Sequence, residues 1–312
     1  MSAVFNYTPQ PKAFDGIVLL AVDGGATVWA FPNASCSLSD SDNISRPSLI
    51  DSSEIAHIEV PGLRMGSLSF ACPLMPDRAV DSFLNAAHGP RTNQTLTPFV
   101  YNIIPYGGGG IIKGTGVWFG RTTISGSFGV GGAQAMNVMR CSAMVMDVDN
   151  VLGAPTLAAP AVVGKNGLGA SSFDNSSFTN SGATTYDKIR SYSMTVDNSL
   201  SVIPGISDPV NRIGAGCQVG DLRGAFTLEQ LESPTNAVPG VRGQYPFTLA
   251  LPTGDRSHKL SLDLSTSRDG SNLSLVPTDF IGRGQLYSIF GTNAGNTTGT
   301  AGMPWLFQAV YI

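Results

Sequence analysis

The chain has 312 residues and a formal net charge of −4, from 18 basic and 22 acidic side chains. Charged residues make up 13% of the sequence, well below the ~25% of an average protein, and neither half is basic. This composition argues against a protein that binds nucleic acid through a positively charged surface. The 37 glycines and the scarcity of charge favour a protein that covers much of its surface with copies of itself.

Strand patterns dominate the sequence, and the first two predict a β-hairpin. Ile17–Val22 and Thr27–Phe31 are runs of strand length. Asp23-Gly24-Gly25 lies between them, and glycine readily adopts the positive φ of a tight turn. The next segment, Ala34–Asp40, alternates small hydroxyl residues with apolar ones. That alternation predicts a strand with one polar face and one apolar face.

One segment has the spacing of a helix. Pro76-Asp77 is typical of a helix start, Gly89-Pro90 is typical of a helix end, and apolar residues recur between them at helical intervals. We therefore expect a helix over 77–87. Thr227–Leu231 is a second, shorter helix candidate that Pro234 ends. Helix should remain a minor part of the chain.

A long hairpin and a long connection follow the first helix. Trp118–Phe128 and Met136–Met146 are expected strands joined by a turn at Gly129–Gly132. The stretch 147–185 contains prolines, glycines and a Ser/Asn cluster but few charges. Solvated linkers are more polar than this, so we interpret it as an arm or loop that lies against neighbouring chains.

The clearest period-two alternation lies near the C-terminal end. Leu260–Ser265 alternates apolar and polar residues, and Asn272–Val276 continues the pattern after Arg268–Ser271. Asp and Gly in the intervening segment are typical turn residues. The sequence therefore predicts a hairpin that turns at 268–271.

The two halves of the chain carry similar patterns in the same order, at offsets close to half the chain length. In each half an alternating hydroxyl strand is followed by a Gly-containing strand, a second Gly-containing strand and a strongly apolar strand. This order predicts an internal duplication. The matched pairs are Ala34–Asp40 with Ser191–Asn198, Met65–Phe70 with Val219–Phe226, Gly114–Phe119 with Gly282–Tyr287, and Val138–Met146 with Trp305–Ile312.

The sequence offers no pattern of an active site or a metal site. His57, His88 and His258 have no second ligand at metal-binding spacing. Gly107–Gly110 is a glycine run, but it lacks the Lys-Ser/Thr of a phosphate-binding loop. We therefore expect no catalytic residue, no metal and no cofactor. An enzyme with a hidden pair of carboxylates is the weaker alternative.

The cysteines and the apolar runs bear on the environment of the chain. Cys36, Cys72, Cys141 and Cys217 are far apart and form no Cys-x-x-Cys pair, so we expect buried reduced thiols, with two disulfides as the alternative. The first residues have no pattern of a secretion signal. The longest apolar run is far too short to span a bilayer, so we expect no membrane partner.

The second alternating strand carries a resemblance to a known family. Ile189–Asn198 alternates Ser and Thr with larger residues and ends in Asp-Asn, a Gly-rich strand follows, and in the first half one helix precedes a long closing hairpin. These patterns resemble the tail-tube proteins of long-tailed, siphovirus-like bacteriophages. The resemblance implies a mainly β fold of two tandem tail-tube-like β-sandwich or barrel modules, each with at most one short helix. The expected division is 1–146 for the first module with an N-terminal arm, 147–185 for the connecting arm or loop, and 186–312 for the second module.

The resemblance also implies a structural virion protein that assembles into stacked rings and forms a conduit for DNA ejection. Its partners are then other copies of itself, other tail proteins at the tube ends, and DNA in passage without specific binding. Two modules per chain favour a trimeric ring with pseudo-sixfold symmetry over a hexamer. The expected location is the virion, after synthesis in the host cytoplasm.

A conduit must not hold phosphates, because each neutralised phosphate adds affinity. No Lys or Arg lies in the alternating strands between Ala34 and Ser45 or between Ser191 and Asn211. We therefore expect the hydroxyl faces of both strands, with nearby carboxylates, to line the bore; the alternative is the solvent face of an ordinary sandwich. The expected lining residues are Ser35, Ser37, Ser39, Asp42, Ser191, Ser193, Thr195 and Asp197.

A second functional hypothesis is another β-rich virion surface protein, such as a decoration protein or a carbohydrate-binding adhesin. Exposed aromatic side chains that form a sugar platform are the feature that favours an adhesin. Trp29, Trp118 and Trp305 all lie within apolar strand patterns, where core packing is the simpler interpretation.

Overall fold

The computed structural model describes most of the chain and is mainly β, with α1 (Arg78–His88) as the one α-helix in the described residues. The sequence therefore predicts this helix correctly. The described ranges are 14–41, 62–76, 78–89, 97–105, 110–128, 136–149, 156–157, 170–180, 189–203, 205–208, 213–231, 244–253, 256, 258–274, 282–289 and 305–311.

The strands of the first half are β1 (Phe14–Val22), β2 (Val28–Ser41), β3 (Met65–Pro73), β4 (Phe99–Pro105), β5 (Ile112–Ser127) and β6 (Val138–Asp149). The strands of the second half are β7 (Ser177–Asn180), β8 (Ile189–Asp197), β9 (Leu200–Val202), β10 (Ile206–Asp208), β11 (Ile213–Gly214), β12 (Cys217–Val219), β13 (Arg223–Leu231), β14 (Gln244–Pro252), β15 (His258–Ser274), β16 (Gly282–Ile289) and β17 (Trp305–Tyr311).

The six strands of the first half close into an antiparallel β-barrel. Their order is β4-β1-β2-β3-β6-β5, and β5 pairs again with β4. Bulges bend the two longest strands of the barrel: Asn33 in β2 and Gly116 in β5 have positive φ of 54° and 64°, and the pairing register shifts beside each. These bends let one end of each strand close the barrel while the other continues into a larger sheet.

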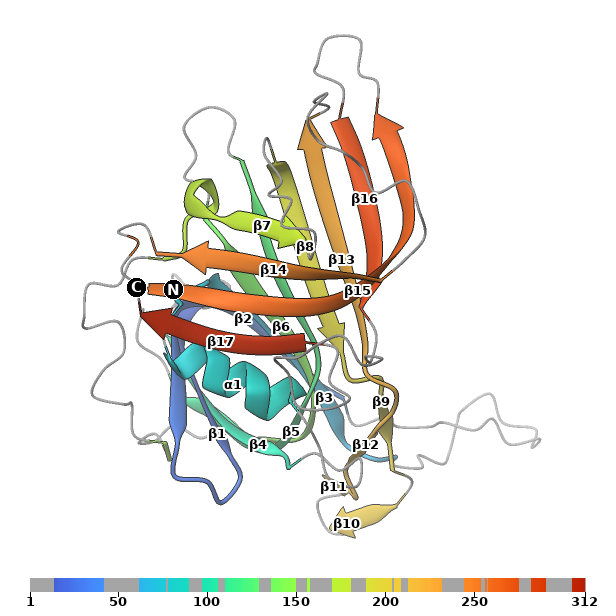
Figure 1. Ribbon diagram of the computed structural model, residues 1–312. Helices are drawn as coiled ribbons and strands as arrows, with labels where there is room; N and C mark the ends of the chain where they lie inside the picture. The colour runs from blue at the N-terminus through green and yellow to red at the C-terminus, as the bar shows by residue number, and fades with distance from the viewer. Residues whose placement is uncertain are drawn as a thin grey trace, which may run out of the picture.

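Helix α1 supplies the centre of the barrel core. Phe83 is fully buried, and its ring centroid lies 4.9 Å from that of Phe31 and 5.2 Å from that of Phe119, with both pairs in edge-to-face geometry. Trp29 and Phe99 complete the aromatic cluster around it. The helix also lies against β17, so an element of the second half packs on an element of the first (Figure 1).

The second half extends the barrel sheet. β8 pairs with the distal part of β5, and the sheet continues in the order β8-β13-β16-β15. β15 is long and curved: residues 258–264 pair with β17, residues 259–267 pair with β14, and residues 266–274 pair with β16. β14 and the first part of β15 therefore cross in front of β8 and β13 as a second layer, which β17 continues beside β15 and over α1 (Figure 1).

The predicted hairpin turn at 268–271 is wrong, because β15 runs through it as one strand of 17 residues. The pairing with β16 shifts between Arg268 and Gly270, so Asp269 is the extra residue of a β-bulge. Its carboxylate accepts a hydrogen bond from the Ser288 hydroxyl. Asp and Gly suit a bulge as well as they suit a turn, so the sequence pattern did not separate the two.

The second helix candidate, Thr227–Leu231, is also wrong, because these residues belong to strand β13. Phe226 and Leu228 are buried while Thr227 is exposed, which is the period-two pattern of a strand. β8 and β16 pair with β13 along both of its edges, and these ladders determine its structure.

Part of the long connection folds on its own chain. β7 pairs with β14, and Phe178 is buried with its ring centroid 4.9 Å from that of Tyr192. Asn137 is fully buried; its amide donates hydrogen bonds to the hydroxyls of Ser171 and Ser176, and its oxygen accepts one from the Tyr192 hydroxyl. Residues 170–180 therefore pack on their own chain, so this part of the connection folds back onto the protomer.

The strand order also bears on the four matched pairs of the sequence. The first two, β2 with β8 and β3 with β13, occupy equivalent places in the sheet order. The other two do not, because the sequence matches join β5 with β16 and β6 with β17. By position in the sheet order, β5 is instead equivalent to β15, and β6 is equivalent to β16.

In the part of the chain described, no helix has the length and apolar character to cross a bilayer.

Candidate functional site: a polar sheet face

Eight neighbouring strands, in the order β2-β3-β6-β5-β8-β13-β16-β15, share one surface that we call the polar face. Residues paired across antiparallel strands point to the same side of a sheet, so the registers place its members together. One row across the face is Ser35, Ala71, Arg140, Thr123, Thr195, Ala225, Ser288 and Ser267. The next is Ser37, Ser69, Ser142, Arg121, Asp197 and Arg223.

The opposite side of the same strands is the core. Leu68, Ile124, Met194, Phe226 and Tyr287 alternate with polar-face residues and are essentially fully buried. The period-two alternation that predicts a polar and an apolar side for β2 and β8 therefore holds across the whole sheet. The barrel, α1 and the second layer pack on the apolar side. On the polar side, β9 and β12 cover one end of β5 and β6, where Trp118, Met144 and Met146 form a second apolar cluster with Cys217, and the two rows given above lie outside that cluster.

The structure brings the two predicted groups of lining residues onto this single face. Ser35, Ser37 and Ser39 are exposed on β2, and Ser191, Ser193, Thr195 and Asp197 are half-buried on β8. Five strands separate β2 from β8 in the sequence, but only β3, β6 and β5 separate them in the sheet. Asp42 lies outside the described residues.

Arginines on β5, β6 and β13 share the face, and the sequence interpretation missed them because it examined basic residues only within β2 and β8. Most of these arginines face carboxylates. Arg121 Nη2 lies 2.8 Å from Asp197 Oδ2, and Arg223 Nη2 lies 3.7 Å from Asp221 Oδ2. The alternation Arg121, Thr123, Ser125 within β5 was the sequence signal that would have revealed this side of the hairpin.

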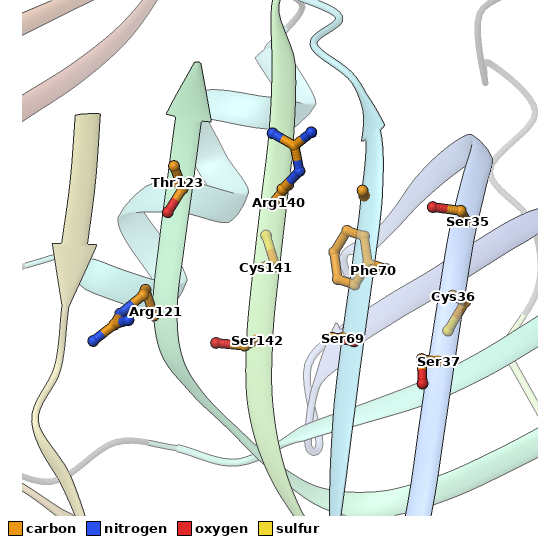
Figure 2. A pocket seen from close by; sticks show the side chains of 11 residues that line it. Ser35, Cys36, Ser37, Ser69, Phe70, Arg121, Thr123, Arg140, Cys141 and Ser142 are labelled. Carbon is orange, nitrogen blue, oxygen red and sulfur yellow. The ribbon is translucent and has the colours of Figure 1, made fainter. Parts of the chain in front are cut away.

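A shallow hollow of about 430 Å³ lies on the polar face over β2, β3, β6 and β5. Its lining combines small side chains with Phe70, and Arg121 and Arg140 lie at one side of it (Figure 2). Arg121 extends toward β8, where it meets Asp197, while Arg140 donates a hydrogen bond of 3.0 Å from Nη1 to Ser125 Oγ. The hydroxyls around the hollow belong to Ser35, Ser37, Ser69, Ser142 and Thr123.

The sheet that carries the polar face has an open edge at each end. β1 pairs with β2 only as far as Cys36, so residues 37–41 have β3 on one side and no described strand on the other. β14 pairs with β15 only as far as Ser267, so residues 268–274 have β16 on one side and no described strand on the other. Such edges present unpaired N–H and C=O groups that pair readily with another strand.

A buried polar network holds the strands of the two halves in register beneath the face. Asn198, fully buried after β8, donates from Nδ2 to the carbonyl oxygens of Ala87 and Phe119, and its backbone N–H donates to Gly120 O. Asn198 Oδ1 lies 3.0 Å from His88 Nδ1. Since the amide nitrogen is used on carbonyls, the oxygen accepts and His88 Nδ1–H donates. His88 is therefore a structural residue at the end of α1.

The cysteines are free thiols. Burial raises the pKa of Cys36 and of Cys217 to about 11 and that of Cys141 to about 12, so these thiols stay protonated at neutral pH. Burial likewise raises the pKa of Tyr192 well above its ordinary value. Within the described ranges, no group of three His, Cys, Asp or Glu side chains is arranged to hold a metal ion.

Comparison with known proteins yields no match to a family model and no match to a curated sequence.

Proposed function

We propose that this chain is a structural, self-assembling tail-tube protein of a long-tailed bacteriophage, whose rings stack into a conduit for DNA. The observation that carries the proposal is the eight-stranded polar face with an open edge at each end. Neighbouring strands alternate in direction, and eight is an even number, so β15 of one copy can pair antiparallel with β2 of the next. Repeated head to tail, this contact extends the sheet and closes it into a ring.

The direction of curvature follows from where the cores lie. The barrel core, α1 and the second layer all pack on the apolar side of the sheet. A closed ring must then place these bulky elements outside and the polar face inside. The lumen is lined by hydroxyls and ion pairs, including Ser35, Ser37, Ser39, Ser191, Ser193, Thr195 and Asp197.

The sheet order supports two tandem modules within the chain. In the first half, four strands lie side by side in the order β2-β3-β6-β5, so the last two are exchanged relative to their order in the sequence. In the second half, four strands lie in the order β8-β13-β16-β15, with the same exchange of the last two. Each module therefore contributes four strands to the lumen, although only the first module has a described helix and a closed barrel.

The number of strands favours a trimeric ring with pseudo-sixfold symmetry. Three chains contribute about 24 strands, and at a strand spacing of ~4.8 Å and a tilt near 40° the backbone of such a barrel is roughly 45–50 Å across. That width admits a DNA duplex with room for lining side chains. Six chains would double it. Assembly into the virion follows synthesis in the host, with other tail proteins as partners at the tube ends.

The alternative of a sugar-binding surface protein gains no support from the tryptophans. Trp29 and Trp118 are 4% and 8% exposed, so neither forms a platform for a sugar ring. The side chain of Trp305 lies outside the described residues.

Lysine substitutions on the polar face test the proposed conduit. The double substitution Ser193→Lys and Thr195→Lys adds two positive charges per chain to the proposed lumen. We expect the assembled tubes to eject DNA several-fold more slowly, because the added charges bind the phosphates of the passing DNA. The matched control is Ser82→Lys with Ser177→Lys, on exposed positions away from the polar face. Ejection from virions carrying each pair is followed by DNA release over time. Equal rates for the two pairs contradict the lumen assignment.

A further inference from the structure

We propose that the hollow on the polar face is an oxyanion site, built around Arg140, that takes a phosphate group. Arg140 differs from the other described arginines of the face because no described carboxylate lies within ion-pair distance of it. Arg121 and Arg223 have such partners at 2.8 Å and 3.7 Å. Among the described residues, the Arg140 guanidinium donates a hydrogen bond to Ser125 Oγ.

The donors around the hollow suit a phosphate. A guanidinium has five N–H donors in a planar fork that matches two oxygens of a phosphate, and Arg140 uses one of them on Ser125. The hydroxyls of Ser35, Ser69 and Ser142 line the same hollow and can donate to further oxygens. Ala71 lies between Ser35 and Arg140 in the register and leaves room beside the guanidinium.

The electrostatics favour an anion at this point of the face. Asp197, a carboxylate in the neighbouring row of the face, accepts hydrogen bonds from Arg121 Nε and Nη2 and from the Ser199 backbone N–H. Its charge is therefore neutralised locally, and the charge of Arg140 is left uncompensated. Because Arg140 is exposed, we expect a weak site with a Kd on the order of millimolar.

Two sources can supply the phosphate: a phosphodiester of nucleic acid or a free phosphate ion. The first rests on the proposed function, because only a lumen brings DNA to this face. A single weak contact per chain lets the duplex slide, whereas a continuous basic lining holds it. The second source needs only the folded chain, so the site is testable apart from the conduit.

The test uses the full chain at concentrations where it remains a single protomer. Arginine Nε–Hε resonances are followed by NMR while inorganic phosphate replaces chloride at constant ionic strength, and Arg140→Gln identifies the Arg140 signal by its loss. We expect phosphate to shift the Arg140 signal, and the affinity measured by calorimetry to fall at least about tenfold in Arg140→Gln. Arg223→Gln removes the same charge outside the hollow and should retain wild-type affinity.

A second variant distinguishes the effect of the shape of the hollow from the effect of the net charge of the chain. Ser69→Leu keeps every charge but fills the floor, and we expect it to weaken phosphate binding about as much as Arg140→Gln does. Unshifted Arg140 resonances, or equal loss of affinity in Arg140→Gln and Arg223→Gln, overturn the site. A short DNA duplex that competes with phosphate identifies the phosphodiester as a ligand, and failure to compete assigns the site to the free ion. Neither outcome depends on whether tubes form.

Discussion

A proline on the open edge of β2 is expected to abolish assembly while leaving the protomer folded. Consecutive residues of an antiparallel strand direct their N–H groups to opposite neighbours. Of Leu38 and Ser39, one therefore donates toward β3 and the other toward the open edge that we assign to β15 of the next copy. Proline removes the N–H in either case.

The two variants should therefore behave differently. The variant that loses the outward N–H keeps the thermal stability of the wild type but forms no rings, because the contact between copies cannot pair. The variant that loses the inward N–H gives up a bond to β3 and loses about 1–3 kcal/mol of protomer stability. Thermal unfolding and analytical ultracentrifugation distinguish them.

A control proline belongs where the proposed assembly does not use the strand. Ser177→Pro lies at the first residue of β7, a position that tolerates proline, and Ser176 before it already has the extended backbone that proline requires. This variant should assemble normally. If both β2 variants also assemble normally, pairing through the β2 edge is refuted.

The second large effect is expected for Asn198→Ala. The substitution leaves the carbonyls of Ala87 and Phe119 and the N–H of His88 without their partner inside the protein. Each buried unsatisfied group costs about 1–3 kcal/mol, so we expect a loss of roughly 3–5 kcal/mol in the free energy of unfolding. Urea denaturation followed by circular dichroism measures it.

Asn175→Ala provides the matched control. The Asn175 amide oxygen accepts hydrogen bonds from the exposed guanidinium of Arg256, so its removal should cost less than about 1 kcal/mol. A loss of similar size in both variants contradicts the assignment of Asn198 as the link between α1, β5 and the end of β8.

The strands and the helix were predictable because their signals are local. The aromatic and aliphatic spacing of α1, the turn at Asp23-Gly24-Gly25 and the alternation of β2 and β8 each reflect which face a residue buries. The errors arose where partners decide the outcome. Thr227–Leu231 is short enough to fit a helix or a strand, and the ladders with β8 and β16 make it a strand.

The polar face was predictable only in part. Alternating hydroxyls in β2 and β8 identified one side of each strand. No local sequence pattern, however, indicates that β3, β6 and β5 join these two strands into one sheet. The arginines of β5 and β6 belong to the face through those long-range pairings. The network of His88 and Asn198, which are 110 positions apart, likewise depends on the fold and leaves no local pattern.

Electron cryomicroscopy of the assembled protein, with the mass per ring measured on the same sample, tests the central claim most directly. Our account predicts closed rings of three chains that stack into a tube, with β2 of one chain paired to β15 of the next and Ser37 and Ser193 facing the channel. Rings of six chains would contradict the trimer. A tube with these serines on its outer surface, or no ring under any assembly condition or in virions that carry the protein, would contradict the proposed function.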